Sequence, residues 1–451
     1  MRIDEHKFFA RKLDYDYRMC VKGEGVWVFD ADGNKYLDAC SGANVSSIGH
    51  GVKEIGAAMQ AQADTIAYVP PQHFLNQPTI DLCRRLLEHA PDHFTRVMLC
   101  SGGSEANENA LKIARQYHVY KGNSGKYLNI ARWQGFHGNT IVADAVGGTT
   151  SRRKISAPML PEVPHIKPSN CFHCPYHQEY PNCGMLCAKA LEDEILQLGP
   201  ENVSAFICEP VVGSANAACT PVKEYFPMIR EICDKHDVLW IDDEIMAGAG
   251  RTGKFLAIEN WDALPDIAVM AKGLSCGYAP LAAILLSDKV WKAFRDGDYP
   301  YIGGHTYNAH PVTATVGLAV LDYVEKNHVY ENVEYKGKLL REGLESLQKK
   351  HPIIGDVRGL GLFQGIEFVR DGKEPFAPEL NVTPRILDRA LEKGLIVYAS
   401  RGCLDGRRGD GLLVCPPLII NEEEIKYIID VLDETITEIV AELKAEGNYD
   451  Y

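Results

Sequence analysis

Asp237-Val-Leu-Trp-Ile-Asp-Asp243 and Asp266-Ile-Ala-Val-Met-Ala-Lys272 are two short apolar runs, and each leads into a charged side chain. Short continuous apolar runs are typical of strands that are buried on both faces of a parallel sheet. Open α/β sheets place their ligand sites at the carboxyl ends of such strands. The sequence therefore predicts that Asp243 and Lys272 face one site at the ends of neighbouring parallel strands.

Lys272 and Asp243 together have the chemistry that pyridoxal phosphate requires. A lysine that forms a Schiff base needs a tight, partly desolvated position, because desolvation lowers the pKa of its amine. The small residues in Gly273-Leu-Ser-Cys-Gly277 allow such a position. The pyridoxal phosphate ring acts as an electron sink when a carboxylate lies against its pyridinium nitrogen. We therefore expect Lys272 to carry this cofactor and Asp243 to face its ring nitrogen.

The bulk composition predicts a soluble, acidic protein. The 451 residues suffice for two or three domains, and 46% apolar and 24% charged residues are ordinary for a globular chain. The formal net charge of −14, without a Lys/Arg block, argues against nucleic-acid or anionic membrane partners. The N-terminus lacks the apolar segment of a signal peptide, and no stretch is apolar enough to span a membrane. Fourteen scattered cysteines suggest reduced thiols, so we expect a cytoplasmic location.

Strands and helices alternate along most of the chain, which predicts an α/β fold. Two alternating runs flank the turn signal Asp30-Ala-Asp-Gly-Asn34, a pattern typical of a β-hairpin. The alternation of strands with helices that follows indicates a large, doubly wound, mostly parallel sheet. Long charged helices with short strands near the C-terminus indicate a smaller α/β domain. We expect residues 1–60 and 326–451 to pack together as the small domain and residues 61–325 to form the large one.

Two further segments offer contacts for a phosphate and for a flat ring. Ser101-Gly-Gly-Ser104 joins an apolar run to a helical one, and Ser104 is predicted to cap the helix whose N–H groups face the anion. Phe136-His-Gly138 offers an aromatic face for stacking. Taken alone, the first segment also fits an ordinary capped helix, and Phe136 also fits a core position.

Six motifs occur in order along essentially the whole chain: Gly103-Ser-Glu-Ala-Asn-Glu108, Phe136-His-Gly138, Asp243-Glu-Ile245, Gly250-Arg-Thr-Gly253, Ala271-Lys-Gly273 and His305-Thr-Tyr-Asn308. In this order and spacing, the chain resembles the class III, or ω-amino acid, transaminases. The resemblance implies a fold-type I pyridoxal phosphate enzyme that catalyses amino transfer.

The resemblance also implies roles for single residues. Lys272 is expected to form the Schiff base and to move the proton, and Asp243, rather than Asp242, to pair with the pyridinium nitrogen. Phe136 and Ile245 are expected to contact the two faces of the ring, and His137 and Glu209 are expected to lie near it. The phosphate is expected to be bound by Gly103, Ser104 and Thr306. Because Thr306 is expected to reach the phosphate of the partner subunit, the active unit is expected to be a homodimer or a higher homo-oligomer.

The implied reaction is a ping-pong transfer from an ω-amino acid or amine, such as a β-alanine-, taurine- or GABA-like donor, to a 2-oxo acid. Relatives that use 2-oxoglutarate often carry a glutamate five residues after the equivalent of Glu209, and Ser214 stands there in this chain, which favours pyruvate. A guanidinium suits a substrate carboxylate, and Arg407 or Arg408 is expected to supply it, although both also fit solvated surface charges. Pocket walls are expected from three aromatic residues: Tyr68, Trp133 and Tyr307.

Two other functions fit part of the sequence. A racemase or epimerase of the same fold shares the cofactor apparatus but exchanges no amino group. A P-loop nucleoside-triphosphatase is suggested by Gly248-Ala-Gly-Arg-Thr-Gly-Lys254. Phe255 stands where a Mg²⁺-binding Ser or Thr is required, and no strand leads directly into the glycines, so this loop is expected to be scaffold.

Two close cysteine pairs occur in Cys171-Phe-His-Cys174 and Cys183-Gly-Met-Leu-Cys187. This spacing suggests a structural zinc site formed by Cys171, Cys174, Cys183 and Cys187. It also fits an insertion loop whose cysteines pack as small apolar groups. No catalytic metal is expected.

Overall fold

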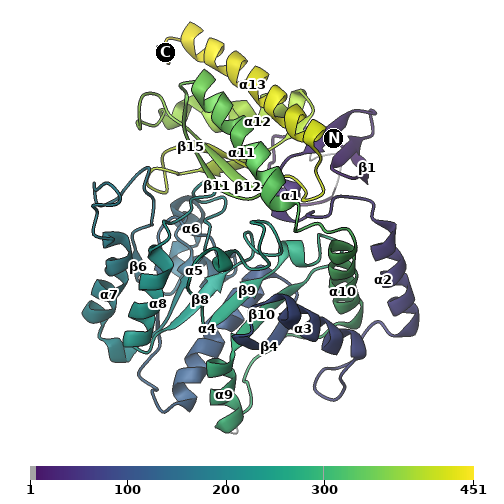
Figure 1. The fold of residues 1–451 in the computed structure, drawn as a ribbon, viewed down its shortest axis with the longest axis vertical. Helices are drawn as coiled ribbons and strands as arrows, with labels where there is room; N and C mark the ends of the chain where they lie inside the picture. The colour runs from purple at the N-terminus through teal and green to yellow at the C-terminus, as the bar shows by residue number, and fades with distance from the viewer. Residues whose placement is uncertain (1–6, 298, 451) are drawn as a thin grey trace.

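The computed structural model describes residues 7–297 and 299–450. Its centre is a seven-stranded sheet formed by β4 (Phe94–Cys100), β5 (Leu128–Arg132), β6 (His165–Ile166), β7 (Val203–Cys208), β8 (Leu239–Asp243), β9 (Ile267–Met270) and β10 (Ala282–Ser287). The strand order is β4-β10-β9-β8-β7-β5-β6 (Figure 1). β10 runs antiparallel to both of its neighbours, whereas β9, β8, β7, β5 and β6 run parallel. This mostly parallel sheet confirms the predicted α/β fold class.

Helices cover both faces of this sheet. One face carries α4 (Gly103–Tyr120), α5 (Ile141–Val146) and α9 (Asp288–Asp296). The opposite face carries α3 (Gln77–His89), α7 (Leu186–Leu198), α8 (Tyr225–Lys235) and α10 (Pro311–Lys326). Successive side chains of a strand point to opposite faces, so Ile241 packs with the α4 side and Trp240 with the α8 side.

A smaller unit is built from both ends of the chain. Its first sheet joins β1 (Cys20–Glu24), β2 (Trp27–Asp30) and β3 (Lys35–Asp38) to β13 (Leu395–Ile396), which pairs in parallel with β3. β2 and β3 form the predicted hairpin. The second sheet contains β11 (Ile354–Leu360), β12 (Phe363–Phe368), β15 (Asp410–Val414) and β14 (Tyr398–Arg401). The pairing of β3 with β13 supports the division into 1–60, 61–325 and 326–451, which stays a prediction.

Three long helices pack on the smaller unit at the top of Figure 1: α11 (Val333–Lys350), α12 (Val382–Glu392) and α13 (Glu422–Ala445). α13 begins with a capping box in which Asn421 accepts from the backbone N–H of Glu424, and three glutamates in its first turn favour the helix dipole. The remaining helices are α1 (Ser41–Asn44), α2 (Lys53–Thr65) and α6 (Thr150–Ser156). Within the described residues, no helix is long and apolar enough to cross a membrane.

The start of α4 differs from the sequence prediction. Gly102 is the N-cap residue, and Ser104 lies inside the first turn with no capping hydrogen bond to a helix N–H. The predicted capping role of Ser104 is therefore wrong. Because Gly102 and Gly103 carry no side chains, the open N–H groups of this turn face the cavity described below.

Candidate active site

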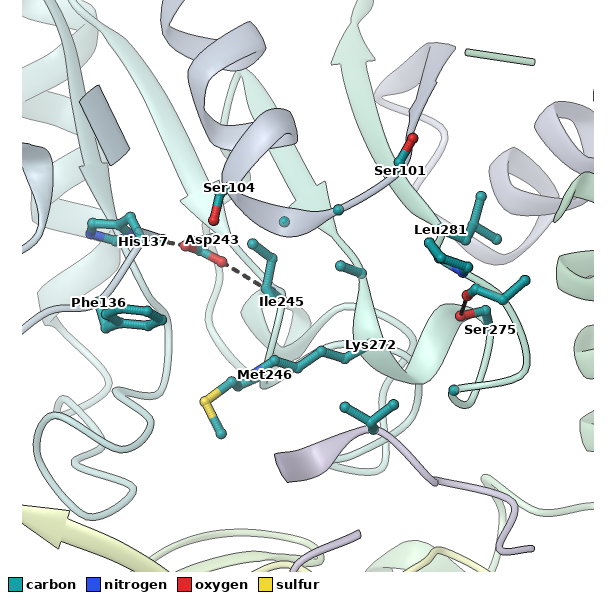
Figure 2. Close-up of a pocket in the computed structure, with 18 of the residues that line it drawn as sticks. Ser101, Ser104, Phe136, His137, Asp243, Ile245, Met246, Lys272, Ser275 and Leu281 are labelled. Carbon is teal, nitrogen blue, oxygen red and sulfur yellow. Dashed lines mark hydrogen bonds and ion pairs between the residues drawn. The ribbon is translucent and has the colours of Figure 1, made fainter. Parts of the chain in front are cut away.

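A cavity of about 420 Å³ lies at the carboxyl ends of β8 and β9 (Figure 2). Eight predicted site residues line it: Gly103, Ser104, Phe136, His137, Glu209, Asp243, Ile245 and Lys272. The backbone around Lys272 and the loop after β8 supply most of the remaining wall. The structure thus brings together residues that are up to 169 positions apart in the sequence, from Gly103 to Lys272.

Asp243 is held in place by three donors. Nδ1 of His137 lies 2.8 Å from its Oδ2, and Nδ2 of Asn107 donates to the same oxygen at 2.8 Å. The backbone N–H of Ile245 donates to Oδ1 at 3.0 Å (Figure 2). The side chain is 2% exposed, so the carboxylate has a fixed orientation in a desolvated place.

Asn107 was not predicted as a site residue. It lies in the second turn of α4, is fully buried, and also donates to the backbone carbonyl of His137 at 2.7 Å. A polar residue among the apolar positions of a helix that packs on a sheet is the sequence signal that would have found it.

The alternation along β8 separates Asp243 from Asp242. Asp243 points to the α4 face, where Asn107 reaches it, whereas Asp242 points to the opposite face. Burial, and then the carboxyl group of Glu244, raise the pKa of Asp242 well above its ordinary value. A raised pKa disfavours the charged form of this carboxyl group. These observations favour Asp243 over Asp242 as the carboxylate of the cavity.

Lys272 follows β9 in a tight turn and has a φ of +47°, which is costly for a residue with a side chain. Burial lowers the pKa of Lys272, and the charge of Asp243 opposes this effect. A lowered pKa increases the fraction of neutral amine, which is the form that attacks a carbonyl carbon or accepts a proton.

The end of the cavity at α4 has room for an anion near the backbone. A side chain at Gly103 would place its Cβ 2.6 Å from Cδ1 of Ile245, and one at Gly138 would place its Cβ 2.4 Å from Oγ of Ser104. Glycine at both positions therefore allows the start of α4 to approach Ile245 and the backbone of Gly138 closely. Oγ of Ser104 accepts from the backbone N–H of Asn139 at 3.2 Å and stays at the cavity surface.

Glu209 shapes the wall through the backbone. Its carboxylate accepts from the N–H of Phe136 and from the N–H of Gly213, both at 3.0 Å. Burial raises the pKa of Glu209, while His137 and these two N–H groups lower it. Glu209 thus fixes the segment that presents the ring of Phe136 to the cavity.

Several predicted residues lie outside this cavity. Thr306 is exposed, and its carbonyl oxygen accepts from the hydroxyl of Tyr68 at 3.0 Å. Arg408 donates from Nε to Asp405 at 2.9 Å, and Arg407 has a side chain that is 72% exposed. Three predicted wall residues are also absent from the lining: Tyr68, Trp133 and Tyr307. Asp405 thus pairs with Arg408, and neither arginine lines the cavity that contains Lys272.

The cysteine pairs do not form the predicted zinc site. Cys171, Cys174, Cys183 and Cys187 border one small cavity of about 30 Å³. Among the residues that the structure describes, however, no group of three or more His, Cys, Asp or Glu side chains is arranged to hold a metal ion. His173 instead pairs with Glu367 at 2.5 Å, which attaches this loop to the smaller unit. The arrangement supports a packed insertion loop.

The glycine-rich loop after β8 is scaffold and not a nucleotide site. No helix begins after Lys254 as a P-loop requires; a short 3₁₀ segment, Ala257–Asn260, follows instead. Arg251 from this loop is buried and donates to the carbonyls of Leu362 and Pro416 and to two serine hydroxyls. The loop therefore joins the large sheet to the smaller unit.

The residues that line the cavity match each part of pyridoxal phosphate. It offers a desolvated lysine, an oriented carboxylate, the ring of Phe136, and a glycine-lined helix start that a phosphate can approach. The steric limits at Gly103 and Gly138 show that the space at the helix start is kept open by the absence of side chains.

Comparisons with known proteins identify the family of the chain. The sequence profile of the class-III aminotransferases matches residues 8–436. The uncharacterized aminotransferase YodT of Bacillus subtilis is 36% identical over 437 residues, which are 96% of this chain and 98% of that protein. The taurine–pyruvate aminotransferase of Bilophila wadsworthia is 35% identical over 448 residues, 97% of this chain and 94% of that protein. The omega-transaminase of Pseudomonas jessenii, solved in complex with PMP, has a TM-score of 0.90 and 29% identity, and the match covers 97% of both chains. The chain thus belongs to the class-III aminotransferase family and is a fold-type I aminotransferase that uses pyridoxal phosphate.

Proposed function

We propose that this aminotransferase moves the amino group of an ω-amino acid or amine, such as a β-alanine-, taurine- or GABA-like donor, to pyruvate. The observation that carries the proposal is the cavity of about 420 Å³ that both Lys272 and Asp243 line. The name of the taurine–pyruvate relative supports both the donor class and the acceptor.

The side chains predicted to contact the cofactor divide its parts among them. Lys272 would hold its aldehyde carbon, and Asp243, oriented by His137 and Asn107, would pair with its ring nitrogen. Phe136 and Ile245 would enclose the ring, Glu209 holds the backbone of Phe136 in place, and Gly103 and Ser104 would hold the phosphate. When bound, pyridoxal phosphate supplies an electron sink for the charge left on the donor carbon.

Lys272 moves the proton of the reaction. Its neutral Nζ would take the proton from the donor carbon as a base and then return it as an acid. Burial lowers the pKa of Lys272, which increases the fraction of its amine that is neutral and able to accept this proton. The backbone constraint at φ +47° fixes the position from which this side chain acts.

The choice of pyruvate rests on the segment that follows Glu209. Ser214 is neutral, and its carbonyl accepts from the hydroxyl of Ser400 at 2.9 Å, so this position offers no carboxylate to pair with a movable arginine. The neutral Ser214 at this position is the feature of the sequence that favours pyruvate over 2-oxoglutarate.

The active unit is proposed to be a homodimer. Thr306 is exposed on a loop outside its own cavity, a position consistent with a contact to the phosphate of the partner subunit. We also propose a cytoplasmic location. The fourteen cysteines, all in the described part of the chain, are free thiols, which suits a reducing compartment.

A donor panel tests the proposed function. The purified protein with pyridoxal phosphate is mixed with each donor and with pyruvate or 2-oxoglutarate, and alanine or glutamate is measured. We expect alanine from ω-amino donors, little glutamate, and no product from Lys272→Ala. Loss of optical activity in a chiral amino acid without amino exchange would instead show a racemase, and the proposed function would be wrong.

A further inference from the structure

Arg152 stacks on a side chain of the active-site wall. It belongs to α6, and its guanidinium carbon is 3.9 Å from the ring centroid of Phe136. Phe136 lines the cavity that contains Lys272. The hydroxyl of Thr150, on the same helix, lies close to Gly406 of the loop that carries Arg407 and Arg408. α6 therefore lies at the edge of the cavity, beside the loop that was expected to supply an arginine for the substrate carboxylate.

The guanidinium of Arg152 is available to a ligand. Among the described residues, its side chain forms no ion pair and no hydrogen bond, although it is exposed next to a catalytic cavity. Its neighbour Arg153 differs, because it donates to the carbonyls of Asp144, Ala145 and Gly147 at the end of α5. Arg408 likewise differs, since Asp405 neutralises it.

Stacking on Phe136 also orients Arg152. A guanidinium that lies on an aromatic face is attracted to the ring and keeps the N–H groups of its plane free. These edges can donate two parallel hydrogen bonds to one carboxylate or sulfonate. Phe136 thus limits the directions that Arg152 samples, which lowers the entropy cost of binding an anion.

The charge of Arg152 acts inside the cavity. Burial lowers the pKa of Lys272, Asp243 and Glu209 oppose this, and Arg152 lowers it further. An anion held by Arg152 would therefore lie within electrostatic reach of the amine of Lys272.

We propose that Arg152 binds the distal acid group, a carboxylate or a sulfonate, of an ω-amino donor whose amine points to Lys272. This inference rests on the proposed function and names the residue that selects acid-bearing donors over plain amines. Arg152 lies outside the lining of the cavity that contains Lys272. In such a donor at least one further carbon separates the acid group from the carbon that bears the amine, whereas the carboxylate of pyruvate is bonded directly to its reacting carbon. Arg152 is thus assigned to the donor and not to the acceptor.

The test compares Arg152→Gln, Arg152→Lys and Lys154→Gln in the loaded protein, with β-alanine, 4-aminobutyrate, taurine and butylamine as donors. Lys154 is exposed on the same helix, so its substitution makes the same change in net charge without touching Phe136. For Arg152→Gln we expect the KM of acid-bearing donors to rise about 10- to 100-fold, the loss typical of a charge-assisted hydrogen-bonded pair. The KM of butylamine and of pyruvate should stay near the wild-type values.

Two further variants separate the effect of paired hydrogen bonds from the effect of charge alone. Arg152→Lys should give intermediate KM values, because it keeps the charge but loses the paired donors, and Lys154→Gln should match the wild type. A rise confined to the KM of pyruvate, or unchanged KM values for all acid-bearing donors, overturns the assignment. Absence of alanine from every donor in the wild type, in contrast, rejects the proposed function itself.

Discussion

Nδ1 of His137 lies 2.8 Å from Oδ2 of Asp243, and Asn107 of α4 donates to the same oxygen. The two donors come from different elements, so the carboxylate is fixed by the meeting of α4 with the 136–138 segment at the end of β8. A carboxylate that is already oriented loses no further freedom when it pairs with a positively charged ring nitrogen. This arrangement explains why Asp243 is suited to stabilise charge during amino transfer.

Asp243→Asn is expected to lower kcat for amino transfer about 100-fold or more, because the oriented negative charge is lost. Asp242→Asn is the matched control. Asp242 lies on the opposite face of β8 and its pKa is raised well above the ordinary value by burial, so an amide resembles its protonated form. Steady-state kinetics with one donor and pyruvate compare the two. Equal losses in both variants would contradict the assignment of the ring partner.

Gly103→Ala is expected to weaken binding of pyridoxal phosphate about 10-fold or more, because the new Cβ would lie 2.6 Å from Cδ1 of Ile245. The strain must be relieved by moving either the start of α4 or the wall of the ring site. Gly56→Ala, in α2, meets no atom within 4 Å and serves as the control. Titration of the apo protein with the cofactor, followed by absorption, gives both dissociation constants. Wild-type affinity in Gly103→Ala would show that this contact does not shape the site.

Arg251→Ala is expected to lower the free energy of unfolding by about 3 kcal/mol or more, because it leaves buried carbonyl groups without donors. Arg251 reaches carbonyls of Leu362 and Pro416 and the hydroxyls of Ser41 and Ser47, so it joins segments from both ends of the chain. Lys254→Ala, at an exposed position of the same loop, should leave stability near the wild-type value. Urea unfolding measures both. A small effect of Arg251→Ala would mean that the loop is not the connection between the two units.

Glu244 should make stability depend on pH. Burial raises its pKa from 4.5 to about 7, so the folded protein keeps this proton at pH values where the unfolded chain releases it. The stabilising contribution is complete below about 4.5 and is lost as the pH rises through about 7. The free energy of unfolding of the wild type, relative to that of Glu244→Gln, should therefore decrease as the pH is raised from about 4.5 to about 7. A difference that is constant or rises with pH would show that Glu244 is not held protonated.

The strand ends could be predicted from the sequence, because continuous apolar runs of β-branched and aromatic residues identify buried strands. Alternation along β8 then separates Asp243 from Asp242. Ser104 was assigned to the wrong position, because both a serine cap and a glycine start satisfy local preferences and only the packing of α4 selects Gly102. Asn107 was missed for a related reason: its partner, Asp243, is 136 residues away.

Loop side chains were the least predictable part of the site. The direction of Arg408 depends on Asp405, which captures it within the same turn, and the place of Arg152 depends on how α6 folds back over Phe136. Neither direction follows from local sequence preferences. The spacing of Cys171, Cys174, Cys183 and Cys187 likewise describes distance along the chain, whereas a metal site needs convergent side chains.

Borohydride reduction of the loaded protein, followed by mass spectrometry of its peptides, tests the central claim most directly. Reduction makes the link between lysine and pyridoxal phosphate permanent, so the modified residue can be identified. The account predicts that the cofactor is found on the peptide that contains Lys272, and that Lys272→Ala carries no label while remaining folded. A label on another lysine of the wild type, or no label at all, would contradict it.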